Sequence, residues 1–502
     1  MLNARVNLIF YFLTLVLSFF SRKIFLNCFG ANFVGLTGTL QNLLGFLNLA
    51  ELGIGSAIGY VLYKPLFDHD QKKINEIISV MGYLYRWIGI IIMGGGIILS
   101  LFLPLIFPTN HTGFQPLLVY FAYYAFLCTT LIGYFINYRQ NLLGADQRNY
   151  VVTGYFQSMN IVKNIIQMIL AYYTRSCYLW VVIELVFGIL YSIILNWKIN
   201  QTYPWLKTEI RRGRELLKAH NQVIVKTKQL FIQKISYFAQ YQTVPFLTYA
   251  FVNLQVVAFY GNYTIITDKI AQFVNTFLES SGASIGNLIA EGNKQKIYNL
   301  FWELLSMRYF LGSTFSFAIL ILVDPFITIW LGTEYVLSNT ILYLIVINVF
   351  IGYTRGGVMQ FLFGYGMFAD IWAPISEIII NLSIAIIGGY LWGLPGVLLG
   401  GISSQLLIVM IWKPTYLFWK GFQQSMWKYW IGFFKLLLSV FIPAIIMLLL
   451  ILPNITIDPY SGYMPWTMYA VIVVGVYSIL TLVLMYAINS GMRRFVKRFI
   501  KI

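Results

Sequence analysis

The sequence predicts an all-α polytopic membrane protein built from two pseudo-symmetric six-helix lobes plus two C-terminal helices. The first indication is composition: the chain has 502 residues, of which 59% are apolar and only 10% charged, whereas a soluble domain is about half apolar and about a quarter charged. The second is length, because many apolar runs reach the roughly 20 residues that a helix needs to cross a bilayer. The third is a duplicated glycine-rich pentapeptide, at residues 55–59 and 282–286, which indicates an internal repeat.

The apolar runs predict about fourteen spanning helices, because a segment in lipid has to satisfy its backbone hydrogen bonds internally. In the first half they cover residues 7–29, 33–63, 80–107, 115–138, 150–173 and 178–198. In the second half they cover 232–253, 255–289, 300–323, 337–363, 371–390 and 394–413, followed by 429–452 and 466–488. The first run is long and lacks a small-residue cleavage site, so we expect a helix there rather than a signal peptide.

The charge of the loops predicts the orientation. An even number of helices puts both termini on one side, and the loops of that side hold nearly all of the loop lysines and arginines, including those of the long loop after Lys198 and of the tail from Arg493 to Lys501. The loops of the other side hold one basic residue, Arg175. The positive-inside rule therefore places both termini in the cytoplasm. This distribution accounts for the net charge of +17 without nucleic acid as a partner.

The internal repeat predicts the domain organisation. Each copy of the pentapeptide ends a predicted helix, and a polar turn with two nearby lysines follows it, Lys72 and Lys73 in the first copy and Lys294 and Lys296 in the second. Both helices run in the same direction, so the repeat is of the parallel kind, with its two-fold axis along the membrane normal. The predicted parts are an N-lobe at 1–200, a basic cytoplasmic linker at 201–231, a C-lobe at 232–420, and two further helices with a basic tail at 421–502.

The glycines of the repeat have a packing interpretation. The spacing of Gly55 with Gly59, and of Gly282 with Gly286, lets two helices approach closely, and we expect these positions to act as pivots between rocking lobes. The second copy also matches the G-x-S-x-G nucleophile elbow. That motif requires a strand–turn–helix with a nearby histidine, and here it lies within a membrane helix.

Other features argue against an enzyme. No Walker motif, dinucleotide fingerprint or metal-ligand cluster is present in the sequence, and the three cysteines lack metal-like spacing. No predicted outer loop is long enough to carry the active site of a polymerase. The sequence therefore predicts no catalytic residue, no metal site and no cofactor, and a protein that is not an enzyme.

Charges within predicted helices are the candidate functional residues, because each costs about 2.5–3.5 kcal/mol to insert. In the functional interpretation, five cations line a cavity between the lobes and hold pyrophosphate by charge-assisted hydrogen bonds. Three carboxylates tune these cations or carry H⁺ or Na⁺. The cations are Arg22, Lys23, Lys163, Lys269 and Arg355, and the carboxylates are Glu51, Asp268 and Glu279.

A structural interpretation of the same charges stays open. In it, cations and carboxylates pair within one lobe and fix helix packing, or extend to the membrane interface. Glu184 and Glu377 are two further carboxylates that could serve in this way. At 1.5 Å per residue, Arg22 and Lys23 lie at about the same depth as Glu51, so either cation can pair with that carboxylate.

Several phrases resemble one protein family. They are FGANFVGL at residues 29–36, NLAELGIGSAI at 48–58, YKPL at 63–66, SIGN at 284–287 and GVLLG at 396–400. With these phrases the chain resembles the polysaccharide flippases of the multidrug/oligosaccharidyl-lipid/polysaccharide exporter superfamily, over most of residues 1–420.

The resemblance implies a two-lobed transporter that works by alternating access. Its cargo would be an undecaprenyl-pyrophosphate-linked oligosaccharide, carried from the inner to the outer leaflet of the bacterial cytoplasmic membrane for O-antigen, capsule or exopolysaccharide synthesis. A polysaccharide polymerase and glycosyltransferases would be its partners. The alternatives are a drug/cation antiporter of the same superfamily, a lipid II flippase, and a membrane-embedded polysaccharide polymerase or ligase.

Overall fold

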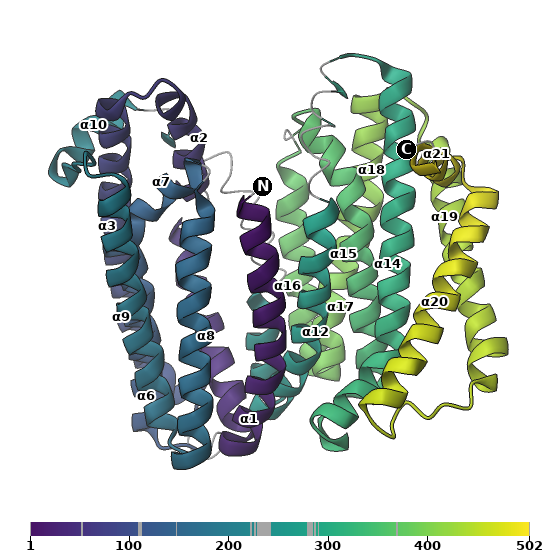
Figure 1. The fold of residues 1–502 in the computed structure, drawn as a ribbon, viewed down its shortest axis with the longest axis horizontal. Coiled ribbons are helices and arrows are strands. Elements are labelled where there is room, and N and C mark those ends of the chain that lie inside the picture. The colour runs from purple at the N-terminus through teal and green to yellow at the C-terminus, as the bar shows by residue number, and fades with distance from the viewer. Residues whose placement is uncertain are drawn as a thin grey trace. The chain divides into compact units, whose positions relative to one another are not determined.

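A computed structural model describes residues 2–51, 54–108, 113–146, 148–220, 223–224, 227, 242–278, 285, 288–289, 291–367 and 370–500. The chain divides into two compact units, unit 1 at Met1–Ala258 and unit 2 at Phe259–Ile502 (Figure 1). The described residues form helices and connecting turns and contain no strand. Each unit has its own apolar core.

Unit 1 contains most of the helices of the first half. They are α1 (Leu2–Leu47), α2 (Ile54–Phe67), α3 (Gln71–Leu101), α4 (Leu103–Ile106), α6 (Pro116–Phe135), α7 (Gln140–Ala145), α8 (Asn149–Thr174), α9 (Cys177–Thr202) and α10 (Gly213–Ala219). Residues 242–251 are also helical. Helix α12 (Leu254–Leu278) begins in unit 1 and continues into unit 2.

Unit 2 holds long helices with local π-helical turns. They are α14 (Lys294–Trp330), α15 (Asn339–Gly364), α16 (Trp372–Trp392), α17 (Leu394–Ser404), α18 (Lys413–Tyr416), α19 (Met426–Ile446), α20 (Tyr463–Ile488) and α21 (Ser490–Ile500). The π-helical segments are η6 (Gln405–Trp412), η7 (Leu417–Phe422) and η8 (Met447–Ile451). Segments η6 and η7, with α18 between them, extend the predicted helix 394–413 to Phe422, and η8 continues α19.

The predicted class, an all-α polytopic membrane protein, is confirmed. Ten helices among the described residues are long and apolar enough to cross a bilayer. Every predicted helix overlaps a described helical segment, although residues 52–53, 232–241, 279–284 and 286–287 lie outside the described residues. The count of fourteen spans, the lobe boundaries and the cytoplasmic termini stay predictions.

Helix α1 covers the first predicted helix and the start of the second. It is broken at Gly30, where φ is 80° and ψ is 166°, a conformation that glycine adopts without the steric cost that a side chain brings. A second break follows at the 3₁₀ turn of Asn48–Glu51, ahead of α2. The predicted helix 33–63 is therefore two shorter helices, and Glu51 lies at the break between them.

The long basic loop after α9 is packed against unit 1 over its first part. Gly213 lies so close to α3 that a Cβ there would be 2.2 Å from the Cβ of Tyr83. The backbone N–H of Glu209 donates to Ser79 Oγ at 2.9 Å, and His220 Nε2 lies 3.0 Å from Glu76 Oε2. Residues 203–220 therefore pack against α3 along the surface of unit 1.

Candidate functional site

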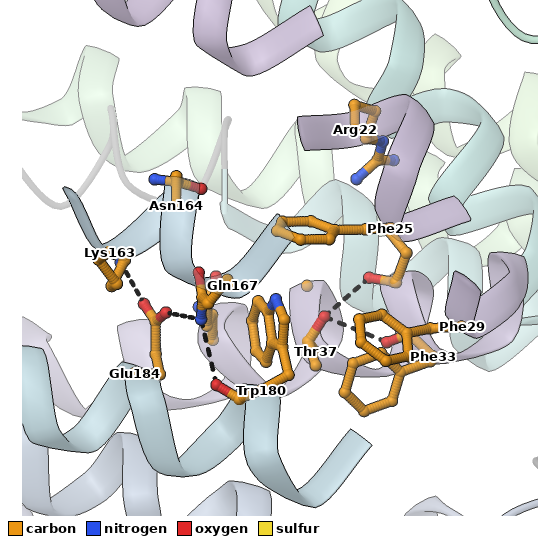
Figure 2. Close-up of a pocket in the computed structure, with 13 residues that line it drawn as sticks. Arg22, Phe25, Phe29, Phe33, Thr37, Lys163, Asn164, Gln167, Trp180 and Glu184 are labelled. Carbon is orange, nitrogen blue, oxygen red and sulfur yellow. Dashed lines mark hydrogen bonds and ion pairs between the residues drawn. The ribbon is translucent and has the colours of Figure 1, made fainter. Parts of the chain in front are cut away.

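Unit 1 contains a pocket of about 230 Å³ within its helices (Figure 2). Its walls come from both parts of α1, from α8 and from the start of α9. The lining combines one ion pair, an arginine, several amides and an aromatic wall. The lining side chains include the polar residues Arg22, Gln41, Lys163, Asn164, Gln167 and Glu184 and the aromatic residues Phe25, Phe29, Phe33 and Trp180.

Arg22 is the predicted site residue that the structure places most clearly at this pocket. It lies on α1, half-buried, and its Nη2 donates to the backbone carbonyl of Ala258 at 2.7 Å. That hydrogen bond holds one edge of the guanidinium, which has five donors in all. The neighbouring Lys23 is exposed and does not line the pocket.

Lys163 is paired within unit 1. Its Nζ lies 2.7 Å from Glu184 Oε1, and Gln167 Nε2 donates to Glu184 Oε2 at 2.8 Å and to the carbonyl of Trp180 at 3.1 Å. Figure 2 shows this group on the side of the pocket away from Arg22. Lys163 and Glu184 thus form the within-lobe pair of the structural interpretation. Because the pair is neutral overall, Arg22 supplies the net positive charge among the pocket's lining residues.

The aromatic wall surrounds Trp180. The Trp180 ring meets Phe25 at 5.9 Å and Phe33 at 5.6 Å between ring centroids, both edge to face. The indole Nε1 of Trp180 is buried and makes no hydrogen bond within the described structure. Aromatic faces next to amide groups suit the apolar faces and hydroxyls of a sugar ring.

Glu51 does not pair with Arg22 or Lys23, so that expectation is wrong. The carboxylate accepts hydrogen bonds from the hydroxyl groups of Tyr85, at 2.5 Å, and Tyr134, at 3.1 Å. Asn141 Nδ2 donates to the Tyr85 hydroxyl at 3.4 Å. The break between α1 and α2 places the half-buried Glu51 within this polar cluster, where hydroxyl donors satisfy the carboxylate in the described structure.

The glycines of the first repeat differ from each other. A Cβ on Gly55 would meet Tyr85 Oη at 3.1 Å and Glu51 Oε1 at 3.4 Å, whereas a Cβ on Gly59 would meet no atom within 4 Å. Close helix packing at Gly59 is therefore absent from the described structure, and Gly55 packs on the Glu51 cluster. Gly282 and Gly286 lie outside the described residues, as does Glu279.

This difference gives a stability prediction. We expect Gly55→Leu to lower the free energy of unfolding by about 1–3 kcal/mol, because the added side chain displaces Tyr85 and Glu51 from each other. Gly59→Leu is the matched control and should remain close to wild type. Thermal unfolding of both variants in detergent measures the effect, and equal melting temperatures for the two would contradict it.

In unit 2 two of the predicted cations lie on different helices. Arg355, on α15, has its Nη1 3.5 Å from Gln405 Oε1, and Gln405 Nε2 donates to Asn348 Oδ1 at 2.8 Å. On α12, Lys269 is half-buried and its neighbour Asp268 is exposed. The gathering of all five predicted cations around one cavity stays a prediction.

The sequence reasoning missed three buried groups of unit 2. Arg308 of α14 is only 5% exposed and lies against Gly356, where a Cβ would be 2.2 Å from its Nη1. Glu303 of α14 is buried beside Arg494 and Arg498, and Asp370 accepts from Lys413 at 2.7 Å. Arg308 and Glu303 both lie in the predicted helix 300–323, so a search for charged residues within the predicted spanning helices could have identified them.

The described residues thus combine a polytopic all-α fold with a polar, aromatic-walled pocket among the helices of unit 1. No family model matches the sequence, and no curated protein matches it significantly. Among solved structures, the lipid II flippase MurJ in an inward closed conformation aligns with a TM-score of 0.65 and 14% identity, over 95% of this chain and 98% of that chain.

A second similar structure is an inward-facing multidrug resistance MATE family transporter of the MOP superfamily. It aligns with a TM-score of 0.60 and 14% identity, over 82% of this chain and 98% of that one. At this level of identity the similarity shows a shared fold. The predicted resemblance to the exporter superfamily is confirmed at the level of the fold.

Proposed function

We propose that this protein is a flippase for an undecaprenyl-pyrophosphate-linked oligosaccharide, acting by alternating access. The observation that carries the proposal is the fold match with a lipid flippase along nearly the whole of both chains. The unit 1 pocket supports it, because it places one guanidinium beside an aromatic and amide surface.

In this proposal each part of the pocket recognises a different part of the cargo. The Arg22 guanidinium binds the pyrophosphate by bidentate, charge-assisted hydrogen bonds. The wall around Trp180, with Gln41 and Asn164, contacts the first sugar. The Lys163–Glu184 pair holds α8 against α9 and keeps Gln167 in place. Arg355 and Lys269 would contribute from unit 2.

The proposal extends to the cellular setting. The protein would lie in the bacterial cytoplasmic membrane with both termini inside, next to the glycosyltransferases that build the glycan and the polymerase that consumes it. It would need no cofactor. A gradient of H⁺ or Na⁺ would act through Glu51, Asp268 or Glu279.

A drug/cation antiporter is the second candidate function. The fold match with a multidrug transporter favours it, and so does Glu51, a half-buried carboxylate that accepts hydrogen bonds from two tyrosine hydroxyls. An antiporter of cationic drugs needs such a carboxylate near its substrate, whereas the lining charges of the described pocket sum to a positive value.

A binding experiment separates the two candidates. The thermal unfolding of the purified protein is measured in the presence of undecaprenyl pyrophosphate, of undecaprenol, or of ethidium as a cationic drug. A ligand that binds only the folded state at 100 times its Kd stabilises by about 2.7 kcal/mol. We expect stabilisation by the pyrophosphate lipid above that by undecaprenol. Stabilisation by ethidium and none by the pyrophosphate lipid would favour the antiporter.

A further inference from the structure

The C-terminal helix α21 separates its residues into two faces. Its four basic residues recur at one- and three-residue intervals, which places them on one side of a helix, and the helix contains no acidic residue. The apolar residues Met492, Phe495 and Val496 occupy the other side. The basic residues are Arg493, Arg494, Lys497 and Arg498.

The apolar face of α21 is already occupied by protein. Met492 is 1% exposed and belongs to the same apolar cluster as Trp302 of α14, with Phe495 and Val496 packed at its edge. Gly491 lies so close to α14 that a Cβ there would be 2.3 Å from the Trp302 carbonyl oxygen. The helix is therefore docked on α14 and does not insert its apolar side into lipid.

The basic face is only partly neutralised. Glu303 Oε2 lies 3.0 Å from Arg498 Nη2, and Glu303 Oε1 lies 3.5 Å from Arg494 Nε. Arg493 and Lys497 are exposed. One carboxylate among four cations leaves the patch strongly positive.

The position of this patch is fixed relative to a spanning helix. A single residue, Asn489, separates α21 from α20, and its extended backbone turns the chain. The Asn489 side chain donates to Ser439 Oγ of α19 at 2.7 Å, and this bond is buried. Figure 1 shows α21 beside one end of α14, turned across α20 rather than continuing it. Arg493 is the fifth residue and Lys497 the ninth after Ile488, where α20 ends. Helix α20 is long and apolar enough to cross a bilayer, and basic residues just beyond such a span are the ones that meet lipid headgroups.

We propose that α21 is a headgroup-binding helix, which holds anionic phospholipids of the adjacent leaflet through Arg493, Lys497 and the outer side of Arg498. Charge complementarity selects an anionic lipid, and each basic residue near such a surface strengthens association on the order of fivefold. Glu303 keeps Arg494 and Arg498 on α14, so that bound lipid clamps the ends of α14 and α20 together. This role is independent of what the protein transports.

Hydrogen exchange of the full-length protein in nanodiscs tests the proposal. The discs contain phosphatidylcholine alone or a mixture with phosphatidylglycerol. We expect amides of residues 490–500 to exchange more slowly in the mixed discs. The double variant Arg493→Gln/Lys497→Gln should weaken this association by roughly 25-fold, two charges at about fivefold each, and so need far more phosphatidylglycerol for the same protection.

Three controls decide between explanations. Lys72→Gln/Lys73→Gln removes two exposed charges from the start of α3 and should leave the lipid effect intact. Glu303→Gln should speed exchange in both kinds of disc and keep the difference between them. Inorganic phosphate added to phosphatidylcholine discs should give no protection. Equal exchange in both discs or an unchanged response of Arg493→Gln/Lys497→Gln would overturn the proposal. So would loss of the lipid response in Lys72→Gln/Lys73→Gln or in Glu303→Gln, or equal protection by phosphate.

Discussion

Replacing Arg22 by glutamine is expected to abolish translocation of the pyrophosphate-linked lipid. Glutamine keeps a donor for the Ala258 carbonyl, which Arg22 holds at 2.7 Å, but it removes the net positive charge of the described lining residues, since Lys163 and Glu184 are paired with each other. Two lost charge-assisted hydrogen bonds at about 1.5–3 kcal/mol each weaken binding at least about a hundredfold. The measurement is the affinity for undecaprenyl pyrophosphate, followed by the rate of transport.

Lys23 supplies the matched control for this prediction. It is the adjacent cation on the same helix, yet it is exposed and does not line the pocket. Lys23→Gln should therefore bind and transport like wild type. Arg22→Lys should recover part of the affinity, since it restores the charge without the bidentate fork. If Arg22→Gln melts like wild type and binds the lipid equally well, the assigned role of Arg22 is wrong.

Replacing Gly396 by alanine is expected to prevent unit 2 from folding normally. Helices α16 and α17 cross here at backbone contact, and a Cβ on Gly396 would lie 1.9 Å from the carbonyl oxygen of Gly388. Neither backbone can move without separating the two helices, so we expect the free energy of unfolding to fall by about 3 kcal/mol. The variant should reach the membrane in reduced amount and unfold at a lower temperature.

Gly401 on the same helix is the control for Gly396. A Cβ there would meet no atom within 4 Å, and alanine is favoured over glycine in a helix by about 1 kcal/mol. Gly401→Ala should therefore be neutral or stabilising, the opposite sign to Gly396→Ala. Thermal unfolding in detergent compares the two, and effects of the same sign and size would refute the close crossing.

The sequence predicted the helices well because lipid leaves the backbone few alternatives. Apolar length alone located segments such as α9 and α20. It could not locate the break at Asn48–Glu51, since the apolar pattern continues through it and the break depends on the tertiary hydrogen bonds of Glu51. Because residues 33–63 were treated as one straight helix, the rise per residue placed Glu51 at the depth of Arg22 and Lys23 and led to the wrong pairing.

The sequence also did not indicate that segment 203–220 packs against a neighbouring helix. The basic segment 203–220 has the composition of a linker, but Gly213 and Ser79 dock it on α3. Of the candidate site, the sequence identified Arg22, Lys163 and Glu184 by their charge. It did not identify Phe25, Phe33 or Trp180, because aromatic residues are frequent throughout the chain and only the fold brings these three together.

The central claim is that the protein moves an anionic lipid-linked glycan across the bilayer. Its most direct test is a proteoliposome assay with a fluorescent undecaprenyl-pyrophosphate oligosaccharide, in which a membrane-impermeant reductant quenches the lipids that reach the outer leaflet. The assay is run with and without an imposed proton gradient. Under both conditions, wild-type protein and Lys23→Gln should bring the inner-leaflet lipid to the outer leaflet, and Arg22→Gln should not. Protein that leaves the labelled lipid in place while it exchanges ethidium for protons would contradict the account.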